Sequence, residues 1–355
     1  MAKGLGSTLT KIPTSSITDS SVGITSMATS GSASSSTFLK GDLSWASVSV
    51  EGKINVADSD PATDTAGDIW YTGGRFKFAI NANEVGGVWS TGGNVNVGRA
   101  QCGGNGALEA GLIFGGNSNI NSTEEYNGIS WTTVNNLLAG STYTQGMGTQ
   151  SAAVQVGGRV SGGASTANCY NYNGTSWSAT GGLSVATEKI GTAGTSSAGL
   201  SFSGGISGGS PSGVSDVTQT FDGSTWTLVN SMLVSRYGPA AYFGTQSSAL
   251  CYGGNSLNPS TFANTETYNG TSWSAASDGL YSLQMGMCAG SSNAEGMCFG
   301  PSNYTQYWDG TSWSRLPNVA NMASDGSGGG NTSAAWCAKT NTMEWNRPIL
   351  RFIGT

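Results

Sequence analysis

The chain has 355 residues, of which 56 are glycine and only 10% are charged, and no segment shows the 3.6-residue periodicity of an amphipathic helix, so we expect an all-β fold. Its net charge of −6, with only 14 Lys and Arg residues, argues against a nucleic-acid partner, because phosphate binding needs basic patches. The chain contains no histidine, which excludes imidazole-ligated copper sites, serine-triad chemistry and a histidine general acid or base.

The first 50 residues are rich in Ser, Thr and Gly and have few large apolar side chains, so alone they cannot build a hydrophobic core. The sequence TSGSASSSTFLKGDLSWASV, which begins at Thr29, resembles segments near the amino termini of phage tail-fibre and virion-fibre proteins. AGDIWYTGGRFKF, from Ala66 to Phe78, resembles the short β-segment that follows them. The resemblance implies an extended virion-attachment segment over residues 1–50 and a short β-neck over 51–85. A Gly/Ser linker without structure is the alternative.

The remaining residues, 86–355, begin and end with incomplete pieces of one repeat. VWSTGG, from Val88 to Gly93, looks like a tryptophan strand, but no Tyr-Asn-Gly hairpin precedes it. TMEWN, from Thr342 to Asn346, looks like a tyrosine strand, but no tryptophan strand follows it. We therefore predict that the Trp89 segment joins the sheet that contains Trp345, which would close a ring and remove its open edges.

Between these ends the chain repeats one aromatic hairpin motif five times. TEEYNGISWT begins at Thr123, and its tryptophan and those of the later copies are 46, 49, 47 and 40 residues apart, a period typical of propellers and solenoids. Asn-Gly or Asp-Gly favours a two-residue hairpin turn, so we expect Tyr126 to pair with Ile129 and Glu124 with Trp131. We interpret the Tyr and Trp positions as packing residues; an aromatic carbohydrate platform is the alternative.

Upstream of each hairpin lies an apolar strand that usually ends on glycine, as in GLIFGG from Gly111 to Gly116. Six such strands, the last being AWCAK from Ala335, predict six blades of four strands, with seven blades as the alternative. A Gly-Gly doublet followed by a Tyr and then a Trp resembles the kelch repeat of β-propellers. That resemblance implies the fold and leaves the function open, since propellers of this kind serve as enzymes, scaffolds and adhesins.

The six cysteines do not have the spacing of a metal site. Three of them share one position of the repeat with Ile113 of the first copy, and no CxxC motif occurs. We expect buried free thiols, no metal and no cofactor. Those three are Cys251, Cys298 and Cys337.

Together the two halves predict a phage structural protein without enzymatic activity, namely a tail fibre or spike whose propeller binds a host-surface receptor. The expected partners are other virion proteins through residues 1–50, a host glycan or protein, and further copies of the chain, as a trimer. We expect synthesis in the host cytoplasm, location on the virion and no membrane insertion, because no apolar stretch approaches 18 residues. A capsid-decorating fibre and a glycan-degrading propeller that uses two carboxylates are the alternatives.

The receptor-binding surface is predicted from loop length. The connections before the tyrosine strands vary, and three consecutive blades carry long ones, starting at Gly158, Gly205 and Gly254, whereas the loop near Pro301 is short. Such loops, with few charges, suit hydrogen bonding to a neutral glycan; loops without a role are the alternative. The candidate residues are Arg159, Ser161, Ser165, Thr166, Ser207, Ser210, Ser212, Asp216, Asn255, Asn258, Ser260 and Asn264.

Overall fold

The computed structural model describes residues 87–207, 213–256, 261–320 and 325–346, and five short strands nearer the amino terminus. The five strands form two small sheets, β1 with β2 and β3 with β4 and β5. Their bounds are Thr37–Leu39 (β1), Trp45–Ser47 (β2), Ile54–Val56 (β3), Ile69–Thr72 (β4) and Arg75–Phe78 (β5). The chain divides into two compact units, and the second, Gly86–Ile349, contains all the other strands.

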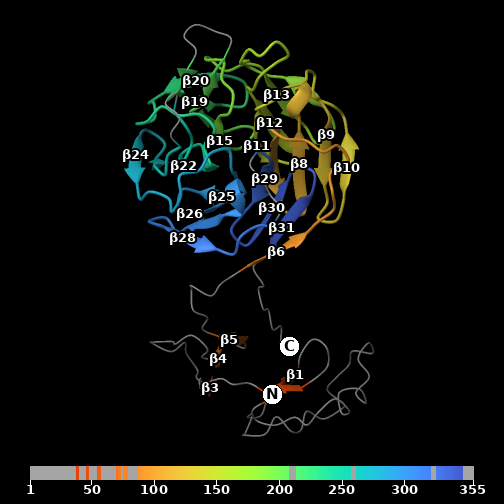
Figure 1. The fold of residues 1–355 in the computed structure, drawn as a ribbon, viewed down its shortest axis with the longest axis vertical. Coiled ribbons are helices and arrows are strands. Elements are labelled where there is room, and N and C mark those ends of the chain that lie inside the picture. The colour runs from red at the N-terminus through yellow and green to blue at the C-terminus, as the bar shows by residue number, and fades with distance from the viewer. Residues whose placement is uncertain are drawn as a thin grey trace. The chain divides into compact units, whose positions relative to one another are not determined.

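The second unit is a ring of six four-stranded antiparallel sheets, or blades, in which strands such as β11 and β29 lie near the middle and β10, β24 and β28 lie on the periphery (Figure 1). Blade 1 is β7 (Gly103–Ala107), β8 (Ala110–Phe114), β9 (Thr123–Tyr126) and β10 (Trp131–Val134). Blade 2 is β11 (Gln145–Thr149), β12 (Ala152–Val156), β13 (Cys169–Tyr172) and β14 (Trp177–Ala179). Blade 3 is β15 (Gly191–Gly194), β16 (Gly199–Phe202), β19 (Thr218–Phe221) and β20 (Trp226–Val229).

Blades 4 to 6 repeat this order. Blade 4 is β21 (Ala241–Thr245), β22 (Ser248–Tyr252), β23 (Thr265–Tyr268) and β24 (Trp273–Ala276). Blade 5 is β25 (Met287–Ser292), β26 (Glu295–Phe299), β27 (Thr305–Trp308) and β28 (Trp313–Leu316). Blade 6 is β29 (Ser327–Gly330), β30 (Ala334–Ala338), β31 (Thr342–Asn346) and β6 (Val88–Thr91). Six four-stranded blades are therefore confirmed, and no seventh sheet of this kind occurs among the described residues of the ring.

Blade 6 closes the ring with strands from both ends of the propeller sequence. β6 pairs antiparallel with β31 in the register Trp345 with Trp89 and Met343 with Thr91. The Gly92 N–H extends the ladder by donating to the Thr342 carbonyl at 2.9 Å. The prediction that the Trp89 segment completes the sheet of Trp345 is confirmed.

The hairpin tips differ from the predicted register. Trp131 pairs directly with Tyr126, and residues 127–130 form a four-residue turn, so Glu124 lies opposite Thr133. The reason is that Asn127 Oδ1 accepts hydrogen bonds from the N–H groups two and three residues on, both at 2.9 Å, and so holds a wider loop. The prediction of a two-residue turn is therefore wrong. The Tyr126 and Trp131 rings still stack, with centroids 4.8 Å apart, and both are buried, as packing residues should be.

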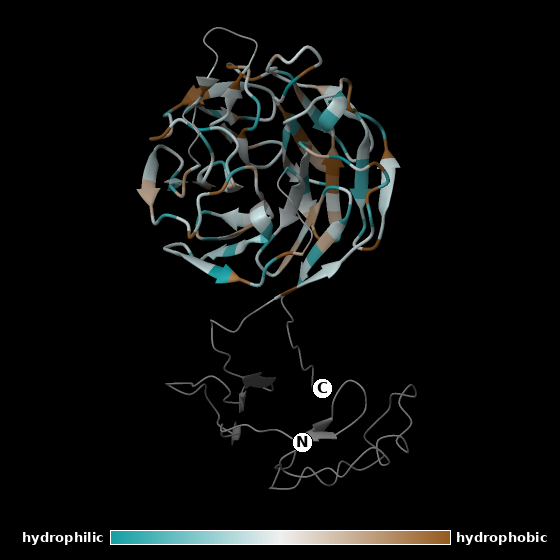
Figure 2. Ribbon diagram, in the orientation of Figure 1, coloured by the Kyte–Doolittle hydropathy of each residue, from teal (hydrophilic) through white to brown (hydrophobic). Residues whose placement is uncertain are grey.

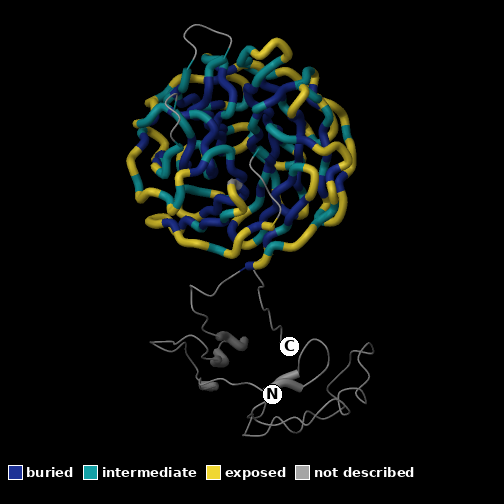
Figure 3. The backbone as a smooth tube through the Cα atoms, viewed as in Figure 1, coloured by how far each residue is buried: buried dark blue, intermediate teal, exposed yellow. Residues whose placement is uncertain are grey.

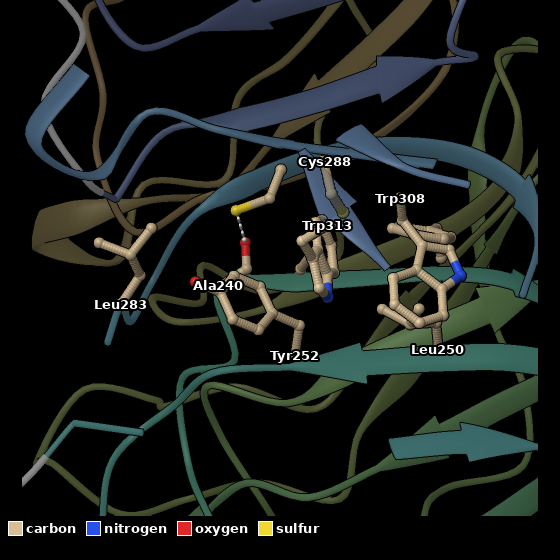
Figure 4. Packing of buried hydrophobic residues seen from close by; sticks show 10 residues of the cluster. Ala240, Leu250, Tyr252, Leu283, Cys288, Trp308 and Trp313 are labelled. Atoms are coloured by element: carbon tan, nitrogen blue, oxygen red, sulfur yellow. Dashed lines mark hydrogen bonds between the residues drawn. The ribbon is translucent and has the colours of Figure 1, made fainter. Parts of the chain in front are cut away.

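The hydrophobic core lies between neighbouring blades. The second strand of each blade is buried along most of its length, and β8 is among the most hydrophobic segments in Figure 2. The outer strands bury their tryptophan and expose most of the rest, which agrees with the exposed periphery in Figure 3. Figure 4 shows one interface, where Leu250 and Tyr252 of blade 4 pack against Trp308 and Trp313 of blade 5.

Five of the six interfaces also contain the same polar contact. The tryptophan at the start of an outer strand donates its Nε1–H to the threonine that begins the third strand of the preceding blade. These pairs are Trp131 with Thr342 (2.8 Å), Trp177 with Thr123 (3.0 Å), Trp273 with Thr218 (2.9 Å), Trp313 with Thr265 (2.9 Å) and Trp89 with Thr305 (3.2 Å). A buried indole N–H needs such an acceptor, so the Thr and Trp positions of the repeat are coupled.

The interface between blades 2 and 3 breaks this pattern. Cys169 occupies the threonine position, so Trp226 Nε1 faces a thiol and has no nitrogen or oxygen acceptor among the residues that the structure describes. Because sulfur is a weak acceptor, this interface carries a buried donor that the other five satisfy.

Cys169→Thr should therefore stabilise the ring by about 0.5–1.5 kcal/mol, the net value of one buried hydrogen bond. The midpoint of urea unfolding measures this, and Thr218→Cys is the reverse control, for which we expect a loss of similar size. An unchanged or lower midpoint for Cys169→Thr would contradict the coupling.

The closing strand predicts a sharp limit to amino-terminal truncation. Removal of residues 1–86 should preserve the thermal transition of the ring, whereas removal of 1–93 should abolish it, because blade 6 loses β6 and exposes Trp345. Equal melting temperatures for the two truncated chains would refute closure by β6.

Candidate functional site

The two rims of the ring carry different connections. The four-residue tips between third and fourth strands lie on one rim, here called the tip face. The connections between second and third strands, and those between blades, lie on the other, here called the loop face. Blades 2, 3 and 4 have long connections there, residues 157–168, 203–217 and 253–264, whereas blade 5 uses only 300–304. The blade 3 connection contains its own two-stranded sheet, β17 (Gly205–Ile206) with β18 (Gly213–Val214).

The long connections of blades 2 and 3 are cross-linked to each other. Arg159 forms an ion pair with Glu188, whose side chain is 2% exposed, and Arg159 Nη2 also donates to Ser207 Oγ at 3.1 Å. Ser207 Oγ donates to Glu188 Oε1 at 3.0 Å. The Ser207 N–H donates to Ser165 Oγ at 2.8 Å, and the Ser165 N–H to the Ser207 carbonyl at 2.9 Å. The structure therefore brings three predicted site residues, Arg159, Ser165 and Ser207, into one network around a carboxylate.

The other predicted residues lie outside this network. Ser161 is exposed at a turn, Thr166 accepts from the Asn168 N–H, and the Asp216 carbonyl accepts from the Met232 N–H. In blade 4, Asn255 Nδ2 donates to Gln284 Oε1 at 2.9 Å, and the exposed Asn264 donates to Asp278 at 3.3 Å. Ser210, Ser212, Asn258 and Ser260 fall outside the described residues.

At the centre of the loop face, six backbone hydrogen bonds form a closed ring. Each blade contributes one residue just before its innermost strand, and the N–H of that residue donates to the carbonyl of its counterpart in the preceding blade, at 2.6–3.1 Å. We call these six residues the hydrogen-bond ring: Gln101, Tyr143, Lys189, Gly238, Met285 and Asp325.

The backbone of the hydrogen-bond ring adopts a conformation that is unfavourable for any residue other than glycine. All six residues have positive φ, between 53° and 74°, but only blade 4 uses glycine. A side chain in this left-handed conformation costs roughly 1–2 kcal/mol. Elsewhere in the described residues, positive φ occurs at glycine, serine or asparagine, so the five other side chains of this ring are candidates for a role of their own.

Lys189 of the hydrogen-bond ring lies between two tyrosines, Tyr143 of the same ring and Tyr237 beside it. Lys189 Nζ lies 4.3 Å from the centroid of the Tyr143 ring and 4.9 Å from that of Tyr237, and Arg159 Cζ lies 5.1 Å from the Tyr143 ring. Burial lowers the pKa of Lys189, an effect that the Glu188 charge opposes. Burial also raises the pKa of Tyr143 and of Asp325. No motif in the sequence marks this cluster, because these positions differ in residue type from blade to blade.

The central channel is blocked beneath the hydrogen-bond ring. On the tip face it opens into a funnel of about 330 Å³ lined by the innermost strands, whereas only about 20 Å³ remains on the loop-face side. Tyr242 lines both spaces, and its hydroxyl donates to Gln145 Oε1 at 2.7 Å. A ligand on the loop face would therefore rest on a closed floor.

Three buried glutamates and six buried cysteines lie in the described part of the ring. Ion pairs join Glu124 to Arg99, Glu188 to Arg159 and Glu266 to Arg236, and each of these glutamates is buried. All six cysteines are buried and unpaired, and burial raises the pKa of the Cys251 and Cys288 thiols to about 12. Within the described segments no group of three or more acidic or cysteine side chains is arranged to hold a metal ion. None of the described segments forms a helix suited to crossing a membrane.

Comparison with known proteins supports the fold. No protein-family model and no curated protein matches the chain. Among solved structures, one entitled "Structure of YjhT" is similar to this chain with a TM-score of 0.60 at 10% sequence identity, over 72% of this chain and 96% of that one. At this identity the likeness shows the fold alone. The chain is a six-bladed β-propeller, and the match agrees with its kelch-like repeat.

The Arg159–Glu188 pair should stabilise the loop face measurably. Arg159→Met leaves the buried Glu188 carboxylate without its cation, so we expect a loss of about 1–3 kcal/mol in urea unfolding, reduced by the partial exposure of Arg159. The double variant Arg159→Met with Glu188→Gln should recover more than half of that loss. Additive losses in the double variant would show that the two side chains do not interact.

Proposed function

We propose that the chain is a non-enzymatic adhesin of a bacteriophage particle, a tail fibre or spike, whose loop face binds a glycan of the host envelope. The observation that carries the proposal is the cross-linked network of Arg159, Glu188, Ser165 and Ser207. It orders two of the three long connections on one rim, as a pre-formed binding surface requires.

The sequence of the first 85 residues supports the virion assignment. Its resemblance to phage fibre proteins favours attachment to other virion proteins through residues 1–50, and assembly as a trimer. A capsid-decorating fibre would use the same two halves. In either case the ring is the distal part that meets the host.

The acidic residues favour binding over hydrolysis. A glycosidase needs two carboxylates facing the scissile bond, about 5–9.5 Å apart. On the described loop face, Glu124, Glu188 and Glu266 are each paired with an arginine, and the remaining carboxylates there are Asp216, Asp278 and Asp325. Release of reducing sugar from host polysaccharide, abolished by one carboxylate substitution, would favour the enzyme alternative.

Adsorption to host cells tests the adhesin directly. We expect removal of the loop tips 160–164, 208–212 and 257–260 to abolish adsorption while the melting temperature changes little. The deletion spares Arg159, Ser165 and Ser207, so the cross-links between the connections remain.

The tip face provides a matched control. Lysine substitutions of Thr175, Thr271 and Thr311, which are exposed on three hairpin tips, should leave adsorption unchanged. If adsorption survives loop removal but is lost in the lysine variant, the binding surface is on the tip face and the proposal is wrong.

A further inference from the structure

Lys189 is a half-buried cation that forms no direct ion pair among the described residues, although Asp325 lines the same narrow space. No carboxylate of the described residues lies within ion-pair distance of its ammonium, which contacts the faces of Tyr143 and Tyr237 instead. The nearby charges are Glu188, Arg159 and Asp325. Glu188 is engaged by Arg159, so it does not provide the hydrogen-bond acceptors that an ammonium group seeks.

The two tyrosines add unused donors. Neither the Tyr143 nor the Tyr237 hydroxyl has a hydrogen bond to another residue in the described part of the chain, although many phenol groups of the ring do. Both rings lie next to the ammonium, on the blades that flank it. The cluster therefore presents the N–H groups of a cation and two O–H groups at the centre of one rim, above a blocked channel.

The backbone conformation of Tyr143 and Lys189 is a second, independent observation. Tyr143 and Lys189 have φ of 54° and 53°, a conformation that their counterpart Gly238 adopts without strain. The hydrogen-bond ring uses only main-chain atoms, so glycine at either position would form it equally well. Closure of the ring does not explain a lysine and a tyrosine here.

We propose that Lys189, Tyr143 and Tyr237 form a subsite for an anionic group carried by a sugar, either a carboxylate or a phosphate. The anion would accept hydrogen bonds from Lys189 Nζ and the two hydroxyls, and partial burial strengthens its attraction to the ammonium. The long connections beside it offer neutral hydrogen-bonding groups for the rest of the glycan. That the anion belongs to a glycan rests on the adhesin function proposed above.

Calorimetric titration of the full chain with three probes tests the subsite: a galacturonic acid trimer, mannose 6-phosphate and a neutral galactose trimer. We expect one acidic probe to bind at least tenfold more tightly than the neutral trimer, with an affinity that falls as salt is added. Preference for the first or the second acidic probe identifies carboxylate or phosphate. Equal affinity for all three, or no binding of either acidic probe, would overturn the proposal.

Variants of Lys189 and the two tyrosines show whether the probe is bound by these side chains. Lys189→Met should reduce affinity for the preferred acidic probe at least tenfold, Lys189→Arg should keep most of it, and Tyr143→Phe with Tyr237→Phe should weaken it without removing either ring. Arg315→Met, which removes one exposed cation from the outer strand β28, is the control and should bind normally. Equal binding by Lys189→Met and the unaltered protein would refute the subsite.

Adsorption to host cells distinguishes this inference from the proposed function. If the unaltered protein and Lys189→Met adsorb equally well, the adhesin stands and the anionic subsite is wrong. If the protein does not adsorb but binds an acidic probe through Lys189, the subsite stands and the adhesin function is wrong.

Discussion

The structure depends on closing a circle of sheets in which every blade is buried on both faces. A single four-stranded blade with apolar residues on both sides of its second strand would expose one or both faces to water. Only a complete ring covers them all. Closure is achieved at two radii. The pairing of β6 with β31 completes the last sheet, and the hydrogen-bond ring joins all six blades through main-chain atoms beside the axis.

The Thr and Trp positions of the repeated hairpin are explained by contacts between neighbouring blades of the ring. Within one copy, the threonine and the tryptophan look like two separate preferences for a β-strand. In the ring, the tryptophan of one blade donates to the threonine of the preceding blade. Each copy of the repeat therefore supplies a donor to one interface and an acceptor to the next. The two terminal pieces obey the rule as well, because Trp89 donates to Thr305 and Trp131 to Thr342. Cys169 is the exception, and it leaves the Trp226 donor facing a thiol.

Closure of the ring does not depend on the long connections of the loop face. The connections of blades 2 to 4 are long. Two of them are joined by the ion pair of Arg159 and Glu188. At the centre, the hydrogen-bond ring joins the six blades through main-chain atoms, so the side chains of its residues are not needed to close it. This division between a main-chain frame and variable side chains is what makes Lys189 and its two tyrosines candidates for recognition.

The sequence by itself determined the all-β class and the closing strand and predicted six four-stranded blades with seven as the alternative, because each follows from a repeated local pattern and its incomplete terminal copies. It also indicated which blades carry long connections, since loop length can be counted directly. It did not determine the register at the hairpin tips, where the Asn127 side chain holds a wider turn than the Asn-Gly pair alone suggests. Only the tertiary structure brought Arg159 to Glu188, 29 residues later, and placed Lys189 between Tyr143 and Tyr237. These contacts join different blades, and their geometry is set by the closed ring, which no local stretch of sequence encodes.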